Sequence, residues 1–123
     1  MRIDRFEDIE GWQLGRKLTQ LIYEPTQRDG FAMDYALRDQ IRRAAGSVMH
    51  NIAEGFDGGS NVEFIRFLRY SQRSCSEVQS ELYVALDQAY LGQEQFQSLY
   101  ELAGQARSKV GAFIAYLLRS GRK

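Results

Sequence analysis

The chain has 123 residues, of which 44% are hydrophobic and 12% aromatic, a composition that suits one well-filled domain and argues against disorder. Sixteen basic residues balance sixteen acidic ones, which excludes a global field that would draw the protein to nucleic acid or an acidic membrane. No apolar run approaches the roughly 20 residues that cross a bilayer, and the single Cys75 cannot form an internal disulfide, so we expect a cytoplasmic protein that does not enter membranes.

Apolar residues recur at helical spacing along the chain, which holds one proline and little alternation of period two, so we expect an all-α fold. The first predicted helix covers about residues 7–24 and carries Leu14, Leu18 and Ile22 on one side. Pro25 is expected to stop it, because proline disfavours helical geometry in the residue before it. A loop is predicted through residues 29–30.

A second helix is predicted to begin after Asp34, whose side chain suits the N-cap position. Its apolar stripe includes Ile41, Val48 and Ile52, and Gly55 is expected to end it in the left-handed conformation. Residues 57–59 then form a turn. Ser60 and Glu63 have the spacing of a capping box, in which each side chain bonds the backbone N–H of the other residue.

The third predicted helix covers about residues 61–90 and ends before Gly92, and the fourth covers about residues 93–119. Short connections between long helices favour antiparallel neighbours. The prediction is therefore an antiparallel up-down-up-down four-helix bundle, formed by one domain over residues 1–123.

Polar residues form a line beside the apolar stripe of the second predicted helix, and Tyr70, Ser74, Glu77 and Glu81 form another on the third. The two lines are expected to meet. The predicted structural network comprises Gln40, Arg43, Ser47, Asn51, Glu54 and Glu77. It would tie helices or subunits together, for example by an ion pair of Arg42 or Arg43 with Glu77, because partly buried charges are costly unless paired. The alternative is a ligand or partner site on the same groups.

No catalytic constellation emerges from the residues. A carboxylate-bridged metal site in a helical bundle uses two Glu-x-x-His motifs, and this chain has the single histidine His50. Cys75 lies on an apolar stripe, as core cysteines do. We therefore expect no enzymatic activity, metal or cofactor, and keep a metal or small-molecule site at His50, Glu54 and Glu77 as a minor hypothesis.

Basic residues gather on local faces and could contact phosphates. One face of the third predicted helix is basic, a second cluster lies on the second helix, and no acidic residue follows Arg107. The nucleic-acid-binding candidates are Arg38, Arg42, Arg66, Arg69, Arg73, Arg119, Arg122 and Lys123. The alternative is that these side chains are solvated or pair with nearby carboxylates.

Five segments form one pattern: residues 6–12, 40–45 with Ser47, 51–55, 63–64 with 67–68, and Ser74 with Glu77. Together they resemble the four-helix-bundle family of bacterial 23S rRNA intervening-sequence proteins. The resemblance implies an antiparallel four-helix bundle that assembles into a ring-like homopentamer. The chain is also similar to the accessory variability proteins of diversity-generating retroelements, which share this assembly and contact a reverse transcriptase and RNA through basic surface.

The chain departs from the family pattern at two positions. Met49 stands where the family usually has a proline, which predicts a straighter second helix. The turn at residues 57–62 begins with Asp57 and lacks the basic residues common in the family, which predicts a diminished RNA contact there.

Two functional hypotheses follow. The first is a non-enzymatic, homo-oligomeric helical scaffold that binds structured RNA or an RNA-associated protein through its basic helix faces. The alternative, favoured by the zero net charge and by Asp57, is a protein–protein interaction module with no nucleic-acid role. An oligomer would also cover aromatic residues that one chain is too small to bury, namely Phe6, Trp12, Tyr23, Tyr35, Tyr83 and Tyr116.

Overall fold

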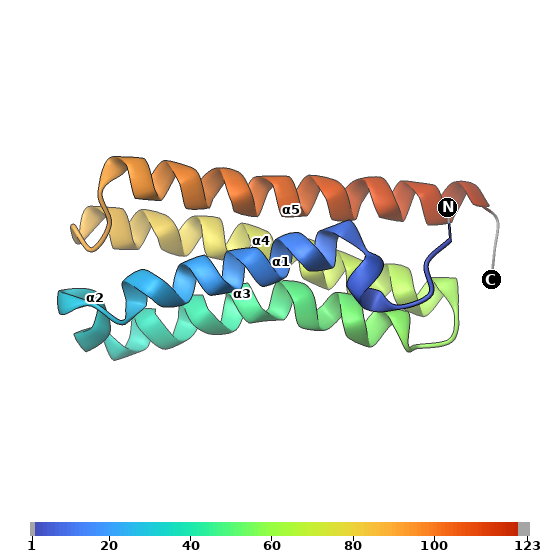
Figure 1. The fold of residues 1–123 in the computed structure, drawn as a ribbon, viewed down its shortest axis with the longest axis horizontal. Helices are drawn as coiled ribbons and strands as arrows, with labels where there is room; N and C mark the ends of the chain where they lie inside the picture. The colour runs from blue at the N-terminus through green and yellow to red at the C-terminus, as the bar shows by residue number, and fades with distance from the viewer. Residues whose placement is uncertain (1, 121–123) are drawn as a thin grey trace.

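A computed structural model describes residues 2–120, which form α-helices and one turn of 3-10 helix and contain no strand (Figure 1). The elements are η1 (Phe6–Asp8), α1 (Glu10–Thr26), α2 (Asp29–Met33), α3 (Tyr35–Phe56), α4 (Asn61–Asp87) and α5 (Gln93–Ser120). The all-α prediction is confirmed. Within these residues, no helix combines the length and the hydropathy that a bilayer span requires.

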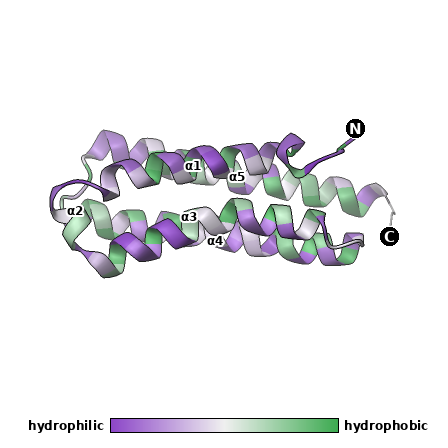
Figure 2. Ribbon diagram, turned by 60° about the horizontal axis from the view of Figure 1, so that its bottom comes forward, coloured by the Kyte–Doolittle hydropathy of each residue, from purple (hydrophilic) through white to green (hydrophobic). Residues whose placement is uncertain are grey.

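The four long helices lie lengthwise beside one another, and the chain reverses direction between each and the next (Figure 1). α1 packs on α3 and α5, and α4 also packs on α3 and α5. Buried apolar side chains such as Leu18, Ile41 and Leu82 fill one part of the interior, and Ile52, Leu68 and Val110 fill the other. Hydrophobic and hydrophilic residues accordingly alternate along the long helices, as amphipathic periodicity requires (Figure 2).

The first connection differs from its prediction. α1 runs through Pro25 to Thr26, two residues past the expected end, and the expected loop at residues 29–30 belongs to the short helix α2. Pro25 has no backbone N–H, so it donates no helical hydrogen bond in this last turn. Side chains hold that turn: the Thr26 hydroxyl donates to the Tyr23 carbonyl at 2.8 Å, and Arg42 Nε donates to Thr26 Oγ at 2.8 Å.

Asp34 caps α3 as predicted and also binds a distant turn. One carboxylate oxygen accepts from the Leu37 backbone N–H at 3.2 Å, and the other accepts from the Tyr90 hydroxyl at 2.9 Å. The Tyr90 ring stacks on buried Phe31 with 5.1 Å between ring centroids. The connection between α4 and α5 is therefore packed against the α2–α3 junction.

The second predicted helix ends close to the predicted residue, but Gly55 does not end it in the left-handed conformation. Gly55 lies inside α3, which continues to Phe56, and the left-handed glycine is Gly59, with φ 92°. A Cβ on Gly55 would stand 2.8 Å from Phe67 Cβ and 3.3 Å from the Phe64 carbonyl oxygen. Glycine is required here because α3 and α4 approach closely, not because the chain turns.

Half of the predicted capping box forms. The Glu63 backbone N–H donates to Ser60 Oγ at 3.2 Å, so Ser60 caps α4. The Glu63 carboxylate instead accepts a hydrogen bond from the Arg66 guanidinium. The expected contact of Glu63 with the Ser60 backbone is replaced by an ion pair one turn along the helix.

α4 ends at Asp87, before the predicted residue 90 and without a glycine. Ala89 takes the left-handed conformation with φ 63°, the Tyr90 N–H donates to the Ala85 carbonyl at 2.9 Å, and the Ala89 N–H donates to the Leu86 carbonyl at 3.0 Å. These two bonds form a Schellman motif, in which glycine is the usual residue. The extent predicted for the last helix is confirmed to within one residue.

The role of Gly55 gives a first prediction. Gly55→Ala should lower the free energy of unfolding by about 1–3 kcal/mol, because its Cβ meets the Phe67 Cβ and main-chain atoms that cannot move aside. Gly46→Ala is the matched control on α3, because its Cβ would meet the His50 ring at an ordinary 3.6 Å. This control should gain up to about 1 kcal/mol of helix propensity. Urea unfolding at fixed protein concentration measures both, and a Gly55→Ala chain as stable as the control would contradict the close approach.

Candidate functional site

Arg66 was predicted to contact phosphates, but in the structure its charge is paired with the carboxylate of Glu63. The guanidinium donates to the Glu63 carboxylate and, at 2.8 Å, to the Tyr70 hydroxyl. It also lies over the Phe67 ring, 5.0 Å from the centroid. Arg66 is exposed, but its charge is largely balanced within α4.

Arg69 and Arg73, the next two candidates on α4, line a shallow hollow with Arg107 of α5. This hollow has a volume of about 390 Å³, and its lining is completed by Gln72 and Ser76. We call it the α4–α5 hollow. Its lining holds three guanidinium groups and no carboxylate. Within residues 2–120, none of the three arginines has a carboxylate oxygen within 4.0 Å.

Hydrogen bonds between the helices hold Arg107 in the α4–α5 hollow. Its Nη1 donates to Ser76 Oγ at 2.9 Å, and its backbone carbonyl accepts from Gln72 Nε2 at 3.2 Å. Both partners come from α4, so the helix that carries Arg69 and Arg73 also positions Arg107. Helical spacing placed Arg69 and Arg73 on one face, but the contribution of Arg107, Gln72 and Ser76 depends on the register between α4 and α5, which spacing within one helix does not encode.

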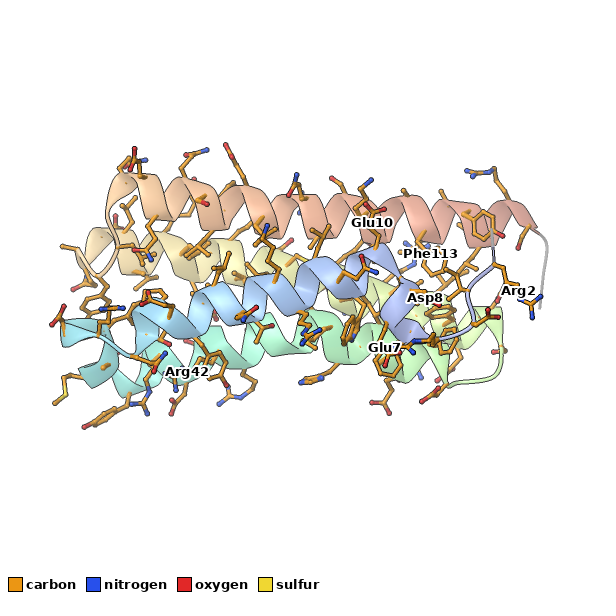
Figure 3. All side chains as sticks on the ribbon, in the orientation of Figure 1. Arg2, Glu7, Asp8, Glu10, Arg42 and Phe113 are labelled. Atoms are coloured by element: carbon orange, nitrogen blue, oxygen red, sulfur yellow. The ribbon has the colours of Figure 1, made fainter. Side chains whose placement is uncertain are left out.

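The second predicted basic cluster, on α3, makes contacts with neighbouring protein groups. Arg38 donates to the Asp39 carboxylate at 2.9 Å and to the Ala32 carbonyl at 3.0 Å. Arg42 bonds Thr26 and lies over the Tyr23 ring, 4.5 Å from its centroid. Arg42 therefore faces α1, toward the end of the molecule that carries α2 (Figure 3). The structure does not bring this cluster together with the arginines of α4.

The remaining basic candidates lie at the end of the chain. Arg119 is exposed in the last turn of α5. Arg122 and Lys123 lie outside the described residues. Lys109, which follows Arg107 on α5, points to another neighbour: its Nζ lies 3.5 Å from Glu10 Oε1 of α1. Figure 3 shows Glu10 between α1 and α5.

α3 and α4 meet along a polar seam formed by Ser47 and Asn51 on one side and Ser71 and Ser74 on the other. The Ser74 hydroxyl bonds Ser47 Oγ at 2.9 Å, and Asn51 Nδ2 donates to the same oxygen at 2.8 Å. The buried Ser71 hydroxyl donates to the Val48 carbonyl at 2.8 Å. Of the residues predicted for the polar network, Ser47 and Asn51 thus lie in this seam.

The charged part of the predicted network does not form. Within the described chain, no ion pair joins Glu77 to Arg42 or Arg43, because Arg42 turns toward α1 while Arg43 and Glu77 are both exposed. Gln40 and Glu54 are exposed as well and make none of the seam's hydrogen bonds. Solvent satisfies exposed charges, so nothing forces these groups to pair.

Glu81 is the one acidic side chain buried among residues 2–120, at 7% exposure. Its Oε1 has no hydrogen-bond partner. The pKa of the Glu81 carboxyl is raised to about 7: burial is the largest cause, the negative charge of Glu77 adds to it, and the positive charge of Arg43 opposes it. Near neutral pH, the folded protein therefore holds this carboxyl partly protonated.

The structure does not support the minor metal hypothesis. Within residues 2–120, no three His, Cys, Asp or Glu side chains are arranged to hold a metal ion, so His50, Glu54 and Glu77 do not converge. Cys75 is fully buried, and burial raises the pKa of its thiol to about 12, which keeps it protonated.

Glu81 gives a prediction with a defined pH window. Its carboxyl pKa is about 7 in the folded chain against 4.5 for the ordinary group, so the folded chain binds the proton more tightly. The stability it contributes is fully present below pH 4.5 and is lost as the pH rises through 7. Glu81→Gln should remove this loss and exceed the natural chain in unfolding free energy by roughly 1–3 kcal/mol at about pH 8.

Urea unfolding from about pH 4.5 to 8, at constant protein concentration, tests this expectation. Glu54→Gln is the matched control, because it makes the same chemical change at an exposed position of α3. It should leave the pH dependence unchanged. Parallel pH profiles for the natural chain and Glu81→Gln would show that Glu81 ionises freely in the folded protein.

Comparison with known proteins identifies the family. A family model described as 23S rRNA-intervening sequence protein matches residues 7–112. A crystal structure of a protein of unknown function from the S23 ribosomal protein family of Bacteroides thetaiotaomicron has the same fold, with a TM-score of 0.77 and 19% identity. The similarity covers 85% of this chain and 97% of that one. No curated protein matches the chain. The chain therefore belongs to the family of 23S rRNA-intervening sequence proteins.

Proposed function

We propose that the protein is a non-enzymatic, homo-oligomeric scaffold, built as an antiparallel up-down-up-down four-helix bundle, that binds structured RNA. The observation that carries the proposal is the pair of exposed arginines on α4, Arg69 and Arg73, which no carboxylate of residues 2–120 balances within ion-pair distance. Cations of this kind bind RNA phosphates and release condensed counterions. The single unpaired Cys75 suits a reducing compartment, so the proposal places the protein in the cytoplasm.

The oligomeric part of the proposal rests on exposed aromatic side chains. Tyr23, Tyr35 and Tyr83 are 43%, 58% and 50% exposed. Tyr23 and Tyr35 each lie under an arginine, at 4.5 and 4.8 Å from the ring centroid. Tyrosine and arginine are enriched at protein interfaces. Phe6, Trp12 and Tyr116 are half-buried within the chain, so the need to cover aromatics applies to the tyrosines of α1, α3 and α4.

The family resemblance favours a homopentamer. Light scattering coupled to size exclusion should then give a mass five times the 14.2 kDa of one chain. Tyr35→Glu tests the proposed interface, because it places a charge on an exposed aromatic surface, and it should reduce that mass. A mass of 14.2 kDa for the natural chain at micromolar concentration would rule out the oligomer.

Charge reversal tests RNA binding directly. Arg69→Glu/Arg73→Glu should weaken binding to a structured 23S rRNA fragment by tenfold or more, and should reduce the slope of log affinity against log salt by roughly 1.5. Fluorescence anisotropy from about 50 to 200 mM salt measures both quantities. The matched control is Arg16→Glu/Lys17→Glu on α1, which changes the net charge equally at exposed positions on another helix. Equal affinities in the two variants, at natural oligomeric mass, would refute a specific role for α4.

The alternative function is a protein–protein interaction module without a nucleic-acid role. The zero net charge and the exposed Asp57, in the turn before α4, favour it. This alternative predicts no salt-dependent RNA binding by the natural chain at any ionic strength. It retains the oligomer, so the mass measurement does not separate the two functions and the RNA titration does.

A further inference from the structure

We infer that the α4–α5 hollow is a binding site for a single phosphate group, held by Arg69, Arg73 and Arg107. The inference deepens the proposed function and rests on it where the phosphate belongs to an RNA backbone. A free phosphate ester offers the same chemistry, and the experiment below separates the two sources.

The first argument is the charge balance of the hollow. Three guanidinium groups from two helices line one space of about 390 Å³, and no carboxylate from the described part of the chain lines it with them. Two other exposed arginines, by contrast, are paired with a carboxylate on their own helix or next to it: Arg28 with Glu24, and Arg66 with Glu63. Like charges brought together without a counter-charge repel one another, and a bound anion removes that repulsion.

The nearest acidic residue along α4 does not fill this role. Glu77 follows Arg73 by one helical turn, but it does not line the hollow and lies beyond ion-pair distance of the arginines. The charge that the hollow lacks is therefore not supplied from the same helix.

The second argument is preorganisation. Ser76 accepts from Arg107 Nη1, and Gln72 donates to the Arg107 carbonyl, so α4 fixes both ends of this residue. The Arg73 guanidinium lies over the Tyr70 ring, 5.8 Å from its centroid. Arginine forks match phosphate oxygens in geometry, and little conformational entropy remains to be lost when they are already oriented.

The third argument concerns what the hollow can recognise. Its lining consists of arginine, glutamine and serine side chains, and it has no aromatic ring on which a base could stack. It is shallow and open along the surface between two helices. We therefore assign the hollow to a phosphate group, whose oxygens the arginine side chains match, and recognition through phosphate carries no sequence information.

The test compares two single substitutions on α5. Arg107→Gln removes one charge from the hollow. Lys109→Gln removes the same charge two residues away, where the lysine pairs with Glu10 outside the hollow. Arg107→Lys keeps the charge but loses the fork. Circular dichroism and oligomeric mass establish that each variant is folded before binding is measured.

The first arm measures RNA. Relative to the natural chain, Arg107→Gln should weaken binding to a structured 23S rRNA fragment by about tenfold, and Lys109→Gln should weaken it by less than about twofold. The affinity of Arg107→Lys should lie between these two. The second arm measures the thermal midpoint in inorganic phosphate against chloride at matched ionic strength. Phosphate should raise the midpoint of the natural chain and of Lys109→Gln, and should not raise that of Arg107→Gln.

The outcomes separate the two proposals. If Arg107→Gln alone loses RNA affinity, the site is supported and its phosphate belongs to RNA. If Arg107→Gln alone loses the phosphate-induced rise of the thermal midpoint, with RNA affinity unaffected, the site is supported and its ligand is a free phosphate ester. The second result, with no RNA binding by the natural chain, refutes the proposed function and leaves the site standing. RNA binding that falls equally in Arg107→Gln and Lys109→Gln, with no selective phosphate effect, overturns the site and leaves RNA binding as a general electrostatic property.

Discussion

The close approach of α3 to α4 is the constraint on which the rest of the structure depends. Gly55 has no side chain, so Phe64 and Phe67 pack directly against the α3 backbone. Farther along the seam, the Ser71 hydroxyl reaches the Val48 carbonyl. Short contacts at both places fix the register of the two helices. A shift of α4 by one residue along α3 would create a steric clash at the first place or leave a buried hydroxyl without a hydrogen-bond partner at the second.

α4 packs against both α3 and α5, and the polar side chains that it places on these two sides differ. Its α3 side is lined with serines and the buried carboxyl of Glu81. Its α5 side carries Gln72 and Ser76, which orient Arg107 beside Arg69 and Arg73. The polar seam is partly to fully buried and its hydrogen bonds join two helices, whereas the basic hollow is open at the surface. α4 thus carries its interhelical hydrogen bonds with α3 on one side and the proposed phosphate site on the other.

Local signals predicted the helices and the caps at Asp34 and Ser60, because these depend on residues close in the chain. They failed at Pro25 and Gly55, where contacts with another helix decide the outcome, and at Ala89, which ends α4 where a glycine is usual. The candidate site divides in the same way. Periodicity placed Arg69 and Arg73 together, but the neutralisation of Arg66 by Glu63 and the arrival of Arg107 follow from rotamers and from interhelical register.

The hydrogen bond between Asp34 and Tyr90 has a consequence for the order of folding. It joins residues 56 positions apart, at the open end of the hairpin that α3 and α4 form. Closing a loop of this length early carries a large entropic cost, whereas zipping the hairpin from its turn at residues 57–60 carries little. We therefore expect the Asp34–Tyr90 hydrogen bond to form after α3 and α4 have paired, so that the end of the molecule that carries α2 is completed late in folding.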